Sequence, residues 1–175
     1  MANRPPRFPD FDYSGFNRYF LTVCVESRKP AFLDIDRGQR IASHFLQLSA
    51  TFQFEVLAYC VMPDHFHSLV AGTAENALLQ PFMRQWKQNT GYWWKHDLGH
   101  HRRLWQEGFY DRIMRDKDPN EGVIRYIIEN PVRAGLVDDA RKYPLIGASK
   151  YNIDDLLESA MFWTPPWKGG GRGRV

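Results

Sequence analysis

The stretch from Phe54 to Ala71 reads FEVLAYCVM, then PD, then HFHSLVA. Its two apolar runs are rich in β-branched and aromatic residues, which favour strands. Between the runs, Pro63 and Asp64 interrupt any regular element. The sequence therefore predicts a β-hairpin with strands over residues 54–62 and 65–71.

The segment before this hairpin predicts a strand and then a helix. Residues 19–25 (YFLTVCV) have strand composition, and residues 34–50 place apolar side chains four and three positions apart, as on one helical face. After the hairpin, a second helix is expected to run to about residue 94. It begins either at Thr73 as N-cap or near Gln80, which puts Pro81 in the first turn, where proline is tolerated.

Residues 109–115 predict another strand. A helix opening at Asp118 follows; Asn130 and Pro131 disfavour its continuation, and Gly135 stops it. A short helix is expected over residues 153–161. The order of elements is strand, helix, strand, strand, helix, strand, helix. It predicts an α+β fold, with a ferredoxin-like βαββαβ antiparallel sheet and an added C-terminal helix.

The length of 175 residues and an apolar content of 43% suit one folded domain. We divide the chain into an extended arm (1–16), a core domain (17–145) and a C-terminal extension with a flexible basic tail (146–175). No run approaches the ~20 apolar residues of a membrane helix, and the N-terminus has no apolar signal core, so we expect a cytoplasmic protein. Cys24 and Cys60 lie in apolar runs and are expected to be small core residues of a reducing compartment.

The net charge is +3, and the tail from Lys168 to Val175 accounts for it with three basic residues and no acidic one. The rest of the chain is neutral, so nucleic-acid binding requires local basic patches. Several basic residues occur among aromatic ones, a combination that suits single strands, although solvated loops look the same. The candidates for DNA binding are Arg4, Arg7, Lys87, Arg102, Arg103 and Arg133.

Two histidines occupy alternate positions in the second strand of the hairpin. Residues i and i+2 of a strand point to the same face, so His65 and His67 could form half of a metal site. The pattern alone is weak evidence, because most histidines ligate nothing.

The expected third helix carries Tyr126 and Asn130 one turn apart, on one face. A tyrosine hydroxyl can attack phosphorus, and an asparagine oxygen can join the two histidines as a ligand of a divalent cation. Considered alone, a tyrosine on an amphipathic helix is more often a residue at the edge of the core.

Three strings together resemble one family. They are VMPDHFHSLV (61–70), WQEGFYDR (105–112) and YIIENPVRAGLV (126–137). They resemble the single-tyrosine HUH transposases of small insertion sequences, and most closely the REP-associated tyrosine transposase branch. The likeness covers most of residues 15–145 and has the histidine and tyrosine strings in the family's order.

The resemblance implies roles for particular residues. His65, His67 and Asn130 would ligate Mg²⁺ or Mn²⁺, and Tyr126 would be the nucleophile. Many insertion-sequence members have Gln where this chain has Asn130, whereas Asn fits the REP-associated branch. Tyr110 is a competing nucleophile, placed on a strand, and Tyr92 ranks below it. Asp64 either orients a ligating histidine or simply shapes the turn.

The implied activity is cleavage of single-stranded DNA beside a hairpin. It leaves a 5′-phosphotyrosine and a free 3′-OH, and a 3′-OH can reverse the step without a nucleotide cofactor. Two alternatives stay open: a module that binds a DNA or RNA hairpin without cutting it, and a metal-dependent hydrolase that uses water. The family resemblance fits either a monomer or a homodimer.

Overall fold

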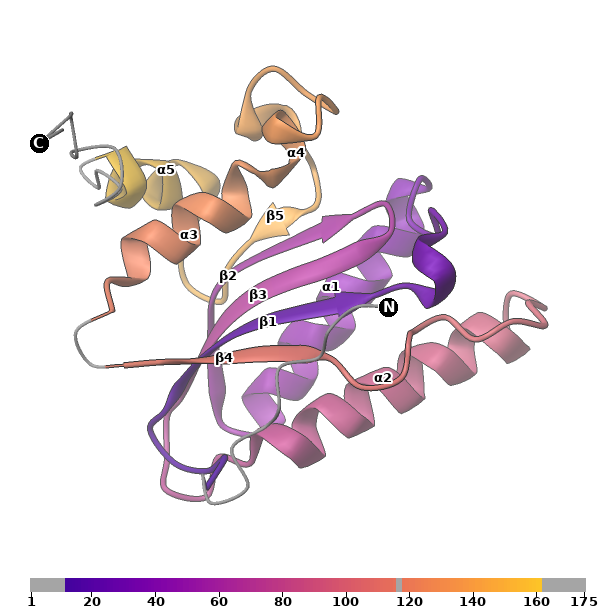
Figure 1. The fold of residues 1–175 in the computed structure, drawn as a ribbon, viewed down its shortest axis with the longest axis horizontal. Helices are drawn as coiled ribbons and strands as arrows, with labels where there is room; N and C mark the ends of the chain where they lie inside the picture. The colour runs from indigo at the N-terminus through magenta and orange to yellow at the C-terminus, as the bar shows by residue number, and fades with distance from the viewer. Residues whose placement is uncertain (1–11, 116–117, 162–175) are drawn as a thin grey trace, which may run out of the picture.

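A five-stranded antiparallel sheet forms the centre of the molecule (Figure 1). The computed structural model describes residues 12–115 and 118–161. The strands are β1 (Arg18–Cys24), β2 (Phe54–Met62), β3 (His65–Gly72), β4 (Tyr110–Met114) and β5 (Ile146–Gly147). Their order across the sheet is β4-β1-β3-β2-β5, and all neighbours are antiparallel. The helices are α1 (Ile35–Thr51), α2 (Leu79–His96), α3 (Asn120–Ile128), α4 (Asn130–Arg133) and α5 (Ile153–Met161), with 3₁₀ turns η1 (Glu26–Arg28) and η2 (Ala140–Lys142). The predicted ferredoxin-like α+β arrangement is confirmed.

One face of the sheet is covered by α1 and α2 (Figure 1). Alternation along β1 turns Tyr19, Leu21 and Val23 into this core, where all three are fully buried. Aromatic rings join the helices to each other and to the sheet: the ring centroid of Phe45 of α1 lies 5.0 Å from that of Trp86 of α2 and 4.7 Å from that of Phe66 of β3. The side chains at intermediate positions of β1 are therefore left on the opposite face of the sheet.

The opposite face is only partly covered, by α3 and α5. Ile124, Ile127 and Ile128 of α3 are buried against residues of β2 and β3, as the helical periodicity predicts. The remaining part of this face, toward β1 and β4, carries the pocket described below.

Proline determines where two of the helices begin or break. Helix α2 starts at Leu79, so Pro81 lies in its first turn and the later of the two expected starts is confirmed. The helix expected to open at Asp118 is divided near Asn130 and Pro131, the two residues expected to disfavour its continuation. It ends at Ile128, and α4 starts again with Pro131 in its first turn, because proline cannot donate the backbone hydrogen bond of a continuous helix. Gly135, with φ +70°, ends α4 as expected.

The segment before β1 packs against the body. Its Tyr13 carbonyl accepts a hydrogen bond from Leu79 N–H, and Gly15 N–H donates to Ala77. Gly15 also passes so close to Gly72 that a Cβ on Gly72 would collide with its backbone oxygen. Arg4 and Arg7 of the expected arm lie outside the described residues, as does the basic tail.

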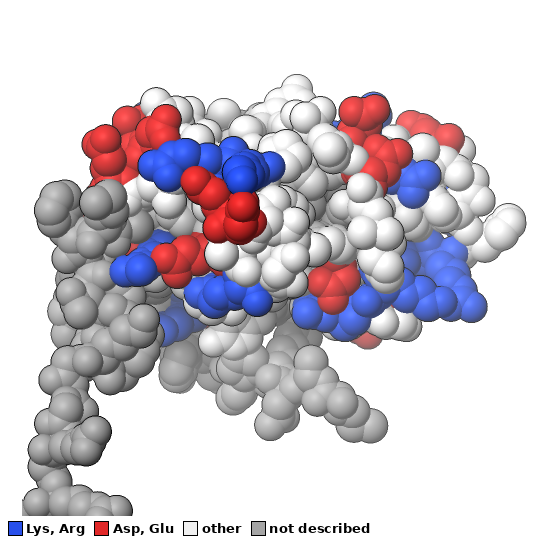
Figure 2. All heavy atoms as spheres, turned by 90° about the horizontal axis from the view of Figure 1, so that it is seen from above, with Lys and Arg blue, Asp and Glu red and all other residues white. Residues whose placement is uncertain are grey.

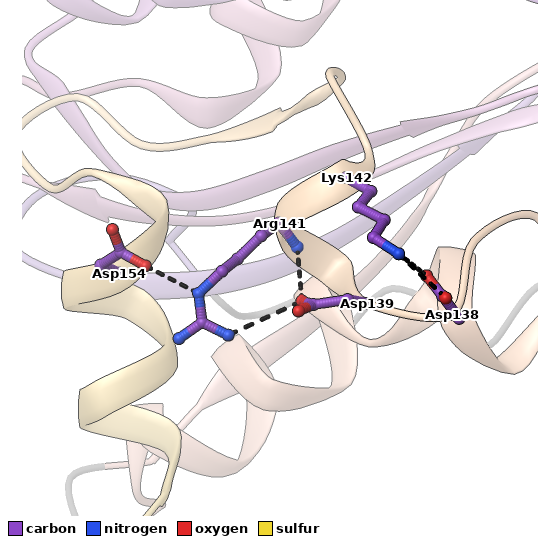
Figure 3. Close-up of polar contacts among 5 residues, drawn as sticks. All are labelled: Asp138, Asp139, Arg141, Lys142 and Asp154. Carbon is purple, nitrogen blue, oxygen red and sulfur yellow. Dashed lines mark hydrogen bonds and ion pairs between the residues drawn. The ribbon is translucent and has the colours of Figure 1, made fainter.

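The C-terminal segment adds the edge strand β5, which pairs with Tyr59 and Cys60 of β2. It continues into α5, and an ion pair joins this helix to η2 (Figure 3). Arg141 donates to Asp154 at 2.8 Å, beside a pair between Lys142 and Asp138. Exposed pairs of this kind add little stability, so the burial of Leu156 is the main anchor of α5.

Both cysteines are free thiols; Cys60 is buried and Cys24 is half-buried at the end of β1. Among the described helices, none is long and apolar enough to span a membrane.

Candidate active site

An open pocket of about 550 Å³ lies on the partly covered face of the sheet. Strands β1, β3 and β4, the turn η1 and the α3–α4 junction all contribute to its wall. The lining residues are Phe20, Thr22, Arg28, His65, His67, Tyr110, Tyr126 and Asn130. The structure thus brings together four residues that the sequence singled out separately: the two histidines, Tyr126 and Asn130.

The two histidines project from β3, the middle strand of the sheet. Both are buried, and their ring centroids are 4.5 Å apart. Phe66 between them points the other way, into the core under α1, where its ring lies 4.7 Å from that of Phe45. The period of two in a strand thus separates a polar pocket from an apolar core.

Each imidazole has its Nδ1 atom engaged. His65 Nδ1 is 2.6 Å from Asp64 Oδ1, and His67 Nδ1 is 2.8 Å from Thr22 Oγ1. Such partners fix the ring orientation and leave the lone pair on Nε2, as is usual for histidines that ligate metals. The Asp64 contact is the orienting interaction considered from the sequence, and Thr22 faces His67 across the β1–β3 ladder.

Burial keeps both histidines neutral. The pKa of His67 is lowered to about 3, mainly by burial and also by the neighbouring His65, Arg28 and Arg133. Burial also lowers the pKa of His65, although the hydrogen bond that His65 donates to Asp64 opposes this. Neutral imidazoles are the form that binds metal ions.

Tyr126 stands at the mouth of the pocket, with 45% of its surface exposed. Its ring meets those of His67 and Phe20 edge-on, with centroids 5.6 and 5.7 Å away. Arg133 covers the other side: its guanidinium carbon lies 4.3 Å from the ring centre, and its Nη2 donates to the Tyr126 carbonyl at 2.6 Å. The phenol is therefore held between an aromatic wall and a cation, with access to solvent.

Asn130 lies just beyond the break between α3 and α4 and faces the same pocket as Tyr126. Its Nδ2 is buried and makes no hydrogen bond to any described residue. Rotation of the amide exchanges its nitrogen and oxygen, so the same position can present Oδ1 as a ligand.

These donors fit a divalent cation. Two imidazole nitrogens and one amide oxygen suit several divalent ions. No cluster of three His, Cys, Asp or Glu residues occurs in residues 12–115 and 118–161, so the amide would have to complete the set. All three donors are neutral, which would leave the ion's charge available to an anion such as a phosphate.

A family model described as "Transposase IS200 like" matches residues 17–130. The chain belongs to the IS200-like transposase family. It is therefore a transposase, an enzyme that cleaves DNA with a tyrosine nucleophile.

Two other proteins are similar to this transposase over most of its length. A Haemophilus influenzae protein named as a REP-associated tyrosine transposase is 27% identical over 143 residues, which is 76% of this chain and 80% of that one. A solved REP-associated tyrosine transposase, bound to a REP hairpin, has the same fold with a TM-score of 0.65 and 19% identity, over 81% of each chain. The expected transposase family is confirmed, and both similarities agree with the expected REP-associated branch.

The other residues proposed from the sequence lie in different places. Lys87 of α2 directs its ammonium to the carbonyls of Gln106, at 2.7 Å, and Gly108. Arg102 and Arg103 are exposed in the α2–β4 connection. Lys and Arg gather toward the right of Figure 2, the end where Figure 1 shows η1 and that connection. Tyr92 is exposed on α2, whereas Tyr110 does line the pocket.

Sequence reasoning missed three pocket residues of this transposase: Phe20, Thr22 and Arg28. Side chains along β1 alternate between the core and the opposite face of the sheet. This alternation could have indicated that Phe20 and Thr22 lie on the pocket face, together with position 24. The partnership of Thr22 with His67 further required the strand register. No local pattern marks Arg28.

Proposed function

We propose that this transposase cuts and rejoins single-stranded DNA at a hairpin through a covalent bond to Tyr126. His65, His67 and Asn130 would hold a divalent cation, Mg²⁺ or Mn²⁺, beside that tyrosine. The observation that supports this proposal best is the convergence of Tyr126, both histidines and Asn130 on one pocket. Three different elements supply these residues, and a protein that only binds DNA has no need to bring them together.

In the proposed reaction the hydroxyl oxygen of Tyr126 attacks the phosphorus of the bound strand. A bond forms between that oxygen and phosphorus, and the bond from phosphorus to the 3′-oxygen breaks. The phenolic proton passes to solvent, and the 3′-oxygen takes up a proton. The strand is left as a 5′-phosphotyrosine with a free 3′-OH, which can attack in reverse and restore the phosphodiester.

The surroundings of Tyr126 suit this role. Its side chain is partly exposed and can meet a strand from solvent, while Phe20 and Arg133 contact the ring. A positioned nucleophile lowers the barrier because little orientational freedom remains to be lost. The guanidinium of Arg133 also adds positive charge near the phosphate, where negative charge accumulates during the attack.

The cation would supply Lewis-acid polarisation of the phosphate. The part played by the protein is to present Nε2 of His65 and His67 in fixed orientations, since their Nδ1 atoms are held by Asp64 and Thr22. Burial supports this by keeping both rings unprotonated at neutral pH.

A hairpin is the proposed substrate because the structural relative was solved with a REP hairpin. Arg102 and Arg103, which are exposed in the α2–β4 connection, would contact phosphates of the bound strand. Arg4 and Arg7 remain candidates for the same purpose. A phosphate at Lys87 would have to compete with the carbonyls of Gln106 and Gly108.

Tyr110 is the second candidate nucleophile, because it lines the same pocket and is 39% exposed. It lies on the edge strand β4 opposite Thr22, without the guanidinium that holds Tyr126. We therefore favour Tyr126 and use Tyr110 as the matched control.

An adduct assay tests the proposal. The full chain is incubated with labelled single-stranded hairpins, taken from the DNA that flanks its gene, and with Mn²⁺ or Mg²⁺. We expect a DNA–protein adduct that survives denaturation, that Tyr126→Phe and His65→Ala abolish, and that Tyr110→Phe retains. An adduct lost only in Tyr110→Phe would reassign the nucleophile. Tight binding with no adduct in any variant would favour the hairpin-binding module, and cleavage with no adduct would favour a hydrolase.

A further inference from the structure

Arg28 is the one pocket residue with a permanent charge whose role nothing above explains. It ends the turn η1, directly after β1, and its side chain is 49% exposed. Its Nε donates to Asp64 Oδ2 at 2.9 Å, and its Nη1 donates to Cys24 Sγ at 3.0 Å. Its Nη2 donates to no atom of the described residues, so one edge of the guanidinium is left for a ligand.

The backbone that carries Arg28 is unusual. Ser27 and Arg28 both have left-handed conformations, with φ of 57° and 54°. The left-handed region of backbone conformation is unfavourable for residues with a Cβ. Such a conformation persists where surrounding contacts hold the backbone in place, and it often marks a functional site. Backbone hydrogen bonds hold this turn in place: Val25 N–H donates to the Asp64 carbonyl, and Glu26 N–H donates to the Leu104 carbonyl. A half-exposed ion pair contributes too little to account for two such residues.

Asp64 links Arg28 to the histidines. One of its carboxylate oxygens contacts His65 Nδ1, and the other accepts from Arg28 Nε. A single carboxylate thus fixes the direction of the imidazole and of the guanidinium, on the wall of one pocket. Arginine suits such a position, because its planar fork can hold a carboxylate on one edge and a phosphate on the other.

We propose that Arg28 binds the phosphate of the DNA strand that lies in the pocket, with Asp64 positioning both this guanidinium and His65. The inference rests on the proposed function and adds a specific phosphate contact to it. Arg133, by contrast, is engaged with the ring and carbonyl of Tyr126. The two guanidinium groups therefore have different roles: Arg133 contacts the tyrosine nucleophile, and Arg28 binds the phosphate that the tyrosine attacks.

The first test measures DNA binding without a metal ion. Fluorescence anisotropy with a labelled single-stranded hairpin in EDTA gives the affinity at several salt concentrations. Arg28→Asn removes the charge, and asparagine tolerates a positive φ, so the turn is expected to fold. Arg28→Lys keeps the charge without the fork. Arg141→Asn is the matched control, since Arg141 is also half-exposed and ion-paired but lies beside α5 (Figure 3).

We expect Arg28→Asn to weaken binding about tenfold, as for the loss of a hydrogen bond to a charged group. The slope of log affinity against log salt should become shallower by about 0.7, the value for one contact to single-stranded DNA. Arg28→Lys should keep the slope, and Arg141→Asn should behave as wild type. An unchanged slope and affinity in Arg28→Asn would overturn the proposal.

A second measurement locates the contact. Each phosphate of the strand beside the hairpin is replaced in turn by an uncharged methylphosphonate. One position should weaken binding by the wild-type chain but not by Arg28→Asn. If the variant loses affinity equally at all positions, Arg28 is a general surface cation and the pocket assignment fails.

The rate of adduct formation separates this inference from the proposed function. We expect Arg28→Asn to slow it about 100-fold, as for the removal of one group that stabilises developing charge. A wild-type adduct with undiminished formation in Arg28→Asn would refute the role of Arg28 alone. Binding that depends on Arg28 without a wild-type adduct would refute the tyrosine chemistry alone, and absence of binding by wild type would refute both.

Discussion

Removing the charge of Asp64 should weaken the binding of a divalent cation without unfolding the protein. The carboxylate holds His65 Nδ1 at 2.6 Å and Arg28 Nε at 2.9 Å. Asp64→Asn keeps the shape and an oxygen that can accept from Nδ1, but it loses the charge that strengthens the imidazole as a ligand. Asp64→Ala also removes the hydrogen bond that orients the ring.

Loss of such a supporting partner typically reduces metal affinity 10- to 100-fold. We therefore expect about a tenfold loss for Asp64→Asn and about a 100-fold loss for Asp64→Ala, or roughly 1.4 and 2.7 kcal/mol. The free energy of unfolding should change by less than about 1 kcal/mol, because the Arg28–Asp64 pair is partly exposed.

Isothermal titration with Mn²⁺ at neutral pH measures these affinities directly. Asp154→Asn is the control, an exposed carboxylate paired with Arg141 near α5. Wild-type affinity in Asp64→Ala, together with a loss in His65→Ala, would refute the orienting role of Asp64. Wild-type affinity in both variants would refute His65 as a ligand.

Three further predictions follow from the contacts described above. The pKa of His67 is lowered, mainly by burial, to about 3 from an ordinary 6.5. Below about pH 6.5 the unfolded chain therefore binds a proton that the folded chain does not. The free energy of unfolding, measured with urea, should fall by about 1.4 kcal/mol per pH unit from pH 6.5 toward pH 3, and the fall should be shallower in His67→Gln. Gly72→Ala should lower the free energy of unfolding by about 1–3 kcal/mol, because the new methyl group meets the backbone carbonyl of Gly15 rather than a side chain that can move. An unchanged free energy of unfolding would mean that the segment before β1 shifts readily. Lys87→Met should lower the free energy of unfolding by about 1–3 kcal/mol, since the Gln106 and Gly108 carbonyls lose their donor. A shallower salt dependence of DNA binding in this variant would instead show that Lys87 contacts a phosphate.

Elements with a regular apolar period could be predicted closely from the sequence. The bounds of β2 and α5 agree with the prediction at both ends, and the other main strands and α1 differ by one residue or so. Burial of alternate or helically spaced side chains leaves a direct trace in the sequence. The two-residue strand β5 leaves no such trace, because its pairing with β2 is made by the backbone.

The site could be predicted only in part, for a related reason. His65, His67, Tyr126 and Asn130 belong to short motifs, but their meeting depends on how α3 packs on β2 and β3. Thr22 requires the register of β1 against β3, and Arg28 requires a left-handed turn formed by two residues that have no glycine-like signature. Partners across strands and through strained turns are tertiary information.

The packing of α3 on its own sheet has a consequence for how copies of this protein can cooperate. The isoleucines of α3 are buried against β2 and β3 of the same chain, so the tyrosine and the histidines of one pocket come from one polypeptide. With this arrangement in every copy, we expect that a copy with a defective tyrosine is not rescued by a copy with a defective histidine. When Tyr126→Phe and His65→Ala proteins are mixed, adduct formation should stay absent at any ratio. Within an assembly, each chain would act as an independent cutting unit.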